Sequence, residues 1–144
     1  PPRMDRTRME RARYPSVITL APRFDDVDVL GHVNNVSVVA YLQEARIAFT
    51  KTMHLGAGGR PHRAFVAAML VEYGGELNYP GEVGIRSGLI EIGRSSYTFA
   101  QLVLQAGKAC VYSLVTMVNI GDHGPEALSG EVRAILEARG LVGE

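Results

Sequence analysis

The chain has 144 residues, of which 47% are hydrophobic and 21% are charged, a composition that fits one globular domain with a sizeable core. Lys and Arg together number 15, as do Asp and Glu, and this balance disfavours nucleic-acid binding, which usually needs a basic excess. Cys110 is the only cysteine, which excludes an internal disulfide, and its apolar neighbours indicate a core position. No apolar run is long enough to span a membrane and no secretory signal pattern opens the chain, so we expect a cytoplasmic location.

The chain begins with three short segments that differ in composition. Residues 1–13 are rich in arginine, which is typical of a solvated terminus, so we expect a flexible extension there and a single folded domain over 14–144. Residues 16–24 are short and rich in β-branched side chains, which predicts a first strand. Residues 25–35 form a polar loop.

A long helix is predicted from residue 36 to about residue 53. Apolar residues recur there at intervals of three and four, namely Val38, Leu42, Ala45, Phe49 and Met53. Few positions are polar, so other structure should surround this helix. Asn34 or Asn35 is suited to cap its start, and the glycine-rich stretch 56–59 should end it.

Strand-like segments separated by turn residues fill most of the remaining chain. They lie at 63–78, 83–92, 95–105 and 108–120, and Gly74-Gly75 suggests a bulge or bend in the first. The turns between them are Tyr79-Pro80-Gly81-Glu82, Gly93-Arg94 and Ala106-Gly107. Sequential hairpins of this kind predict an antiparallel sheet. The tail from Pro125 to Arg139 is typical of a short amphipathic helix, with Gly140 after its end.

These elements together indicate an α+β fold in which a five-stranded sheet curves around the long helix. One helix covers only one face of such a sheet. The other face, or an edge, would then need cover from a second subunit.

Residues 25–35, DDVDVLGHVNN, combine carboxylates and a histidine with the predicted helix start. The first backbone N–H groups of a helix have no partner within it, so they can bind an oxyanion or polarise a carbonyl. A carboxylate beside them, such as Asp28, can act as a general base on water or attack the carbonyl directly. These are the components of acyl transfer, although acidic loops before helices are also common simply as caps.

The motif DxDxxGHVNN at 26–35, followed by Tyr41-Leu42 and Glu44-Ala45-Arg46, resembles the hot-dog-fold acyl-CoA thioesterases of the 4-hydroxybenzoyl-CoA thioesterase type. It is also similar to the plant acyl-ACP thioesterases. The similarity covers about residues 15–120 and continues in NYPG at 78–81 and IGRSSYTF at 92–99. It implies a hot-dog fold and hydrolysis of an acyl-CoA or acyl-ACP thioester to free acid and thiol.

The resemblance also implies roles for residues of the motif. Asp28 would be the catalytic base or nucleophile, and the backbone N–H of Asn35 would polarise the thioester carbonyl. His32 would assist by orienting water or substrate, and Asp26 would shape the loop. The motif departs from the acyl-ACP branch at Leu30, where that branch has an asparagine.

The expected substrate contacts are Gly31, Asn34, Arg60 and Arg63, of which the two arginines are candidates to meet CoA phosphates. No metal and no other cofactor are expected, since CoA or the acyl carrier protein is part of the substrate. Hot-dog sites usually lie between subunits, so a homodimer or homotetramer is expected, with neither nucleic acid nor a membrane as partner.

Two alternative functions are compatible with these features. A hot-dog hydratase or dehydratase would act on enoyl thioesters, although such enzymes have a longer spacing between Asp and His, with a proline between them. A non-catalytic acyl-CoA binding module is the other alternative.

Val38 stands where the family helix usually carries an aromatic residue, which can alter the acyl pocket. Glu44 and Arg46 are expected to form an internal polar pair, and His54 and His62 to be loop or surface residues.

Overall fold

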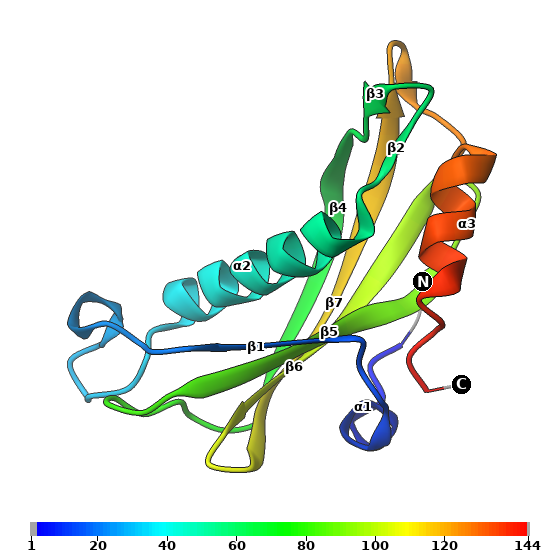
Figure 1. Cartoon of the computed structure of the whole chain (residues 1–144). Helices are drawn as coiled ribbons and strands as arrows, with labels where there is room; N and C mark the ends of the chain where they lie inside the picture. The colour runs from blue at the N-terminus through cyan, green and yellow to red at the C-terminus, as the bar shows by residue number, and fades with distance from the viewer. Residues whose placement is uncertain (1–2, 144) are drawn as a thin grey trace.

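The computed structural model describes residues 3–143, apart from the side chain of Ala57. A curved antiparallel sheet holds a long helix, α2, in its hollow, which is the predicted hot-dog arrangement (Figure 1). The five main strands follow the spatial order β1-β5-β6-β7-β4. Their bounds are β1 Ser16–Leu20, β4 Ala64–Tyr73, β5 Val83–Ile92, β6 Ser96–Gln105 and β7 Lys108–Gly121.

The remaining elements are short, apart from α2. Two small strands, β2 (Gly56–Ala57) and β3 (Arg60–Pro61), form a hairpin between α2 and β4. Strand β8 (Gly124–Pro125) pairs with the end of β7. The helices are α1 (Arg6–Arg11), the 3-10 helix η1 (Phe24–Asp26), α2 (Asn35–Met53) and α3 (Gly130–Ala138).

Helix α2 follows its sequence pattern closely. Its start is capped by Asn34, whose side-chain oxygen accepts the N–H of Ser37 at 2.8 Å, and it ends at His54 in the left-handed conformation. The predicted apolar stripe is buried, and burying each large side chain contributes about 1.5–3 kcal/mol. The stripe packs on the concave face of the sheet, together with Cys110 in the predicted core position.

Helix α3 closes the far end of the hollow, where Leu128, Val132 and Leu136 pack around Phe49 and Met53 of α2. It is shorter than predicted. Pro125 belongs to β8 instead, and the helix begins after Ser129, whose hydroxyl accepts the N–H of Val132 at 3.1 Å. No helix within residues 3–143 is long and apolar enough to cross a membrane. The cytoplasmic location stays a prediction.

The N-terminal segment differs from the expected flexible extension over residues 3–13. Helix α1 packs on the convex face, and the Met9 side chain is fully buried there. Arg6 donates to Glu72 at 3.0 Å and lies 4.8 Å from the ring centre of Tyr112. The convex face of β6 and β7 is apolar, and α1 covers part of it. Residues 1, 2 and 144 of the expected domain division lie outside the described residues.

The prediction of sequential hairpins is wrong for β4. Its strand ends at Tyr73, and the N–H groups of Gly74 and Gly75 both bind the carbonyl of Cys110, where the chain leaves the sheet. The strand pairs with β7 rather than β5, because residues 76–82 cross to the other side of the sheet, where β5 lies between β1 and β6. Strand β4 is therefore an edge strand. Its exposed large apolar side chains are Phe65, Val66, Met69, Leu70 and Tyr73.

Candidate active site at the start of the central helix

Asp28 sits in a closed turn ahead of α2. Its Oδ1 accepts the backbone N–H groups of Leu30 at 2.9 Å and His32 at 3.1 Å. The turn is completed by Gly31, whose φ of +84° suits glycine and whose N–H donates to the Asp28 carbonyl. Oδ2 of Asp28 makes no hydrogen bond to any described residue, and Asp28 is exposed. One carboxylate oxygen is therefore held while the other remains available to water or substrate.

The helix start provides the second component. The cap formed by Asn34 takes up the N–H of Ser37, so the preceding N–H groups of Asn35 and Val36 have no partner within residues 3–143. Both residues are exposed. Unpaired N–H groups at a helix start carry partial positive charge, so a carbonyl oxygen can bind there.

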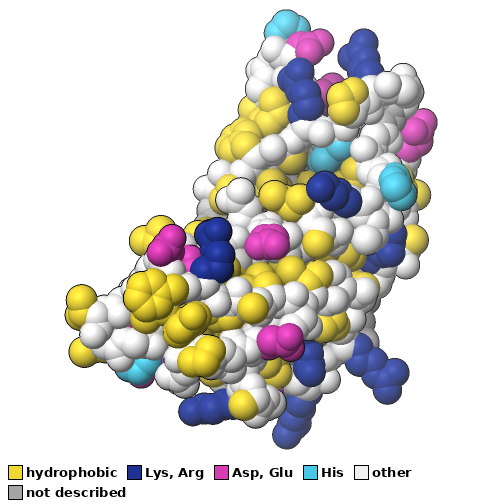
Figure 2. All heavy atoms as spheres, turned by 60° about the vertical axis from the view of Figure 1, so that its left-hand side comes forward, with side chains coloured by type: hydrophobic (Ala, Val, Ile, Leu, Met, Phe, Trp, Pro, Cys, Tyr) yellow, Lys and Arg dark blue, Asp and Glu magenta, His cyan; other side chains and the backbone are white. Residues whose placement is uncertain are grey.

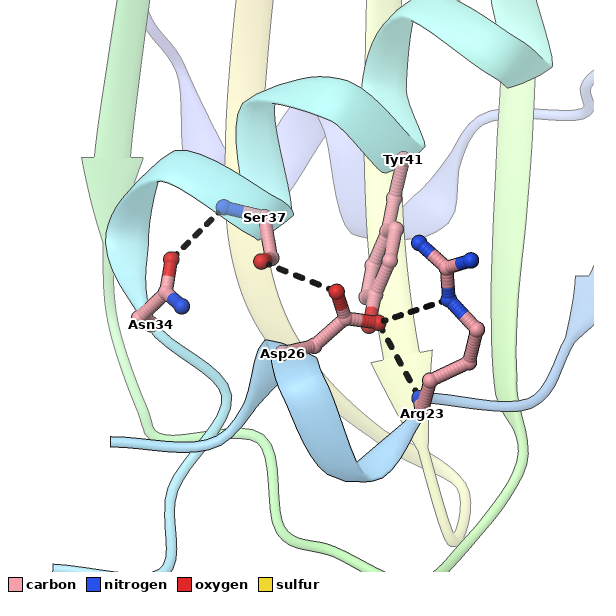
Figure 3. A network of polar contacts seen from close by, with 5 residues as sticks. All are labelled: Arg23, Asp26, Asn34, Ser37 and Tyr41. Carbon is pink, nitrogen blue, oxygen red and sulfur yellow. Dashed lines mark hydrogen bonds and ion pairs between the residues drawn. The ribbon is translucent and has the colours of Figure 1, made fainter. Parts of the chain in front are cut away.

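Asp26 joins the loop to the helix, as Figure 3 shows. Its buried carboxylate accepts the Tyr41 hydroxyl at 2.5 Å, the Arg23 backbone N–H at 3.0 Å and the Ser37 hydroxyl at 3.2 Å. Its carbonyl also accepts the N–H of Asn34. The Tyr41 hydrogen bond is the largest cause of the lowered pKa of the Asp26 carboxyl. Asp26 therefore positions the helix start, consistent with its expected loop-shaping role.

The His32 ring points to a residue that the motif did not indicate. Its Nε2 lies 2.9 Å from a carboxylate oxygen of Glu76, and the His32 backbone forms a bridge with Asn78. The contact to Asp28 comes from the His32 backbone N–H. Glu76 follows β4 in the chain, so no local sequence signal could have paired it with His32.

Arg60 and Arg63 lie at the opposite end of α2 from Asp28. Arg60 is in β3 and Arg63 immediately precedes β4, so both follow the C-terminus of α2. This helix has 19 residues and is about 28 Å long. Both line a cavity of about 800 Å³ near the start of α3, and Arg63 donates to the Gly121 carbonyl at 3.0 Å. A single chain therefore does not bring these arginines to Asp28, although it brings together Gly31, His32, Asn34 and Asn35.

The expected Glu44–Arg46 pair is not formed. Glu44 is exposed, whereas Arg46 is buried and donates to the side-chain oxygen of Gln101 at 3.1 Å. Residues two apart on a helix point in different directions, which separates the two charges. His62 lies in the loop between β3 and β4, as expected, and its half-buried ring lies 2.8 Å from the Tyr97 hydroxyl.

Within residues 3–143, no group of three or more His, Cys, Asp or Glu side chains could hold a metal ion. The absence of a cofactor stays a prediction. A loop carboxylate and unpaired N–H groups at a helix start are groups that can act on a carbonyl.

Comparison with known proteins identifies the class. A model of the thioesterase-like superfamily matches residues 22–136, and the chain belongs to this superfamily. A thioesterase from Thermus thermophilus, solved with coenzyme A and Zn, is 28% identical with a TM-score of 0.79, over 87% of this chain and 99% of that one.

Two further proteins are similar over most of their length. A predicted thioesterase from Bacillus stearothermophilus shares the fold, with 24% identity and a TM-score of 0.77 over 86% of this chain and 95% of that one. The uncharacterised protein YsmA of Bacillus subtilis is 28% identical over 108 residues, 74% of each chain.

Proposed function

We propose that this protein hydrolyses acyl-CoA thioesters at the site formed by Asp28 and the start of α2. The observation that carries the proposal is that one motif supplies both the free Oδ2 of Asp28 and the unpartnered N–H groups of Asn35 and Val36, in a chain of the thioesterase-like superfamily. The coenzyme A bound to the Thermus thioesterase supports CoA as the thiol part of the substrate.

In the general-base route, the thioester carbonyl oxygen accepts the N–H of Asn35. Asp28 takes a proton from water, and the hydroxide adds to the carbonyl carbon. The N–H groups stabilise the negative charge that develops on the oxygen. When the tetrahedral intermediate collapses, the carbon–sulfur bond breaks and the CoA thiolate takes the proton from Asp28.

In the nucleophile route, Oδ2 of Asp28 attacks the carbonyl carbon and expels the CoA thiolate, which is protonated by solvent. Water then cleaves the resulting mixed anhydride. Single turnover in isotopically labelled water separates the two routes, because only the anhydride route can place label on Asp28.

The same proposal includes a homodimer built on β4. A bare apolar edge strand favours pairing with another strand, and a twofold axis would set two β4 strands antiparallel. The start of one β4 would then lie beside the end of the other, where Tyr73 donates to the Asn35 carbonyl at 3.3 Å. This arrangement would bring Arg60 and Arg63 of the second copy toward CoA bound at Asp28.

The direct test is thiol release from a panel of acyl-CoAs with short, long and aromatic acyl groups. Wild-type protein should release thiol, and Asp28→Asn should lower kcat about a hundredfold or more. Asp25→Asn is the matched control, because Asp25 is an exposed neighbouring carboxylate. Unchanged turnover in a folded Asp28→Asn protein would contradict the assignment. Hydration of enoyl-CoA without thiol release would favour the hydratase alternative.

A further inference from the structure

Arg46 is a cation held in the interior by a fixed polar network. Its side chain is on the buried face of α2, and one guanidinium nitrogen donates to the Gln101 side-chain oxygen at 3.1 Å. The Gln101 amide nitrogen donates to the Leu42 carbonyl at 2.9 Å and the Ser87 hydroxyl at 3.0 Å. These two bonds fix which way the amide points, so its oxygen faces Arg46.

No anion accompanies this cation in the described part of the chain. None of the ion pairs there includes Arg46, and burial is the cause that lowers the pKa of its guanidinium. Buried charges are normally paired, because an ion loses its hydration when it leaves water. Arginine stays protonated even so. The site therefore lacks the negative partner that such a charge usually has.

The Arg46 nitrogens that have no hydrogen-bond partner are not fully buried. Among the described residues, Ser113 Oγ is the only fully buried side-chain nitrogen or oxygen that lacks a hydrogen-bond partner. The Arg46 nitrogens that do not bind Gln101 are absent from that class, so solvent can reach them. Arg46 lines a cavity of about 380 Å³ between the second half of α2 and the start of β4. No Asp or Glu lines it, and its other basic side chains are Lys51, which is exposed, and His62. Its apolar walls are formed by Ile47, Phe65, Val66, Phe99 and Met117.

An apolar strip connects this cavity with the helix start. Val66 and Met69 pair across the sheet with Met117 and Val115, so they share the concave face with those core residues. Further along β4, Val71 packs on the core cluster beneath the first half of α2. The strand ends at Tyr73, which contacts Asn35. Hydrophobic side chains lie exposed on the face shown in Figure 2.

We propose that this cavity is the distal end of the acyl site and that Arg46 binds a carboxylate at the far end of the acyl group. The inference rests on the proposed thioesterase function and assigns its substrate class, which is the CoA monothioesters of dicarboxylic acids. Arg46 lies about 16 Å along the helix from Asn35, and helical side chains lean toward the N-terminus. An extended chain of roughly eight to ten carbons covers the remaining distance.

Matched substrate pairs test this on the unmodified protein. The pairs are suberoyl-CoA against octanoyl-CoA and sebacoyl-CoA against decanoyl-CoA, which differ only in the terminal carboxylate. We expect kcat/KM to be about tenfold or more higher for the dicarboxylic member of each pair, as hydrogen bonds to a charged group imply. Equal values, or preference for the plain acyl chain, would overturn the inference while leaving the thioesterase function intact.

Variants assign the preference to Arg46. Arg46→Met should bring the two members of each pair close to equal rates, and Arg46→Lys should restore part of the difference. Lys108→Met, which removes an exposed cation at the start of β7, should keep the preference. A preference unchanged in folded Arg46→Met would reject the role of Arg46.

A binding measurement separates this inference from the proposed function. Thermal shift with sebacate and with decanoate needs no turnover. Stabilisation by sebacate that exceeds stabilisation by decanoate, and that Arg46→Met abolishes, would support the distal site even if no thioester were hydrolysed. Equal stabilisation by both acids would count against it.

Discussion

The Tyr41 hydroxyl lies 2.5 Å from the Asp26 carboxylate, deep beneath the loop that carries Asp28. Tyr41 comes from α2 and Asp26 from η1, so this hydrogen bond ties the loop to the helix whose start it precedes (Figure 3). This buried contact therefore helps to position the proposed catalytic carboxylate relative to the proposed carbonyl-binding N–H groups.

Tyr41→Phe should destabilise the protein by about 1–3 kcal/mol at pH 7, because it leaves a buried charged acceptor with one donor fewer. The pKa of Asp26 is lowered in the folded state, so its contribution is present above the unfolded pKa, about 3.9, and is lost as pH falls through the folded pKa. The difference between wild type and variant should therefore shrink at low pH. Urea unfolding at pH 7 and at acid pH measures both, and a pH-independent difference would contradict this account.

Gly31→Ala should impair activity more than stability. No atom lies within 4 Å of an added Cβ, so the cost is the left-handed backbone alone, about 1–2 kcal/mol. Relief of that strain would shift the turn that holds Asp28, and kcat should fall. Gly84→Ala is the control, since its Cβ position is also open and its φ is not positive. Thermal melting and thiol release should therefore separate the two variants.

Glu76 should act by holding the His32 ring rather than by its charge. Glu76→Gln keeps an acceptor oxygen near His32 Nε2, so kcat should stay close to wild type. Glu76→Ala removes the acceptor and should lower kcat several-fold, with little change in melting temperature because the pair is partly exposed. Equal loss in both variants would indicate that the charge itself matters.

Strand β4 should be the dimer contact. Met69→Lys places a charge on the edge strand, and lysine there opposes pairing between sheet edges. The wild-type protein should have twice the 15.6 kDa chain mass by light scattering, and the variant should approach the chain mass itself. Val17→Lys places the same charge on β1, at the opposite edge, and should leave the mass unchanged. A monomeric wild-type protein would reject the dimer.

The residue pattern alone was sufficient for the local features of this fold. The interval of three and four between apolar residues predicted α2, because a helix places those positions on one face. The Asn34 cap and the hairpins joining β5, β6 and β7 depend on residues close together in the chain. The motif from Asp26 to Asn35 likewise located the candidate site on one contiguous loop.

Tertiary structure decided what depends on distant pairing. The partner of β4 is β7 and not β5, His32 meets Glu76, and Arg46 meets Gln101 rather than Glu44. It also showed that Arg60 and Arg63 lie a helix length away from Asp28 within one chain. Periodicity and capping depend on interactions between residues that are close together in the sequence, so a local pattern is enough to predict them. Contacts across the sheet are selected only by the packing of the whole chain. Local residue patterns therefore specify the elements and the loop chemistry, whereas the complete fold selects which side chains meet.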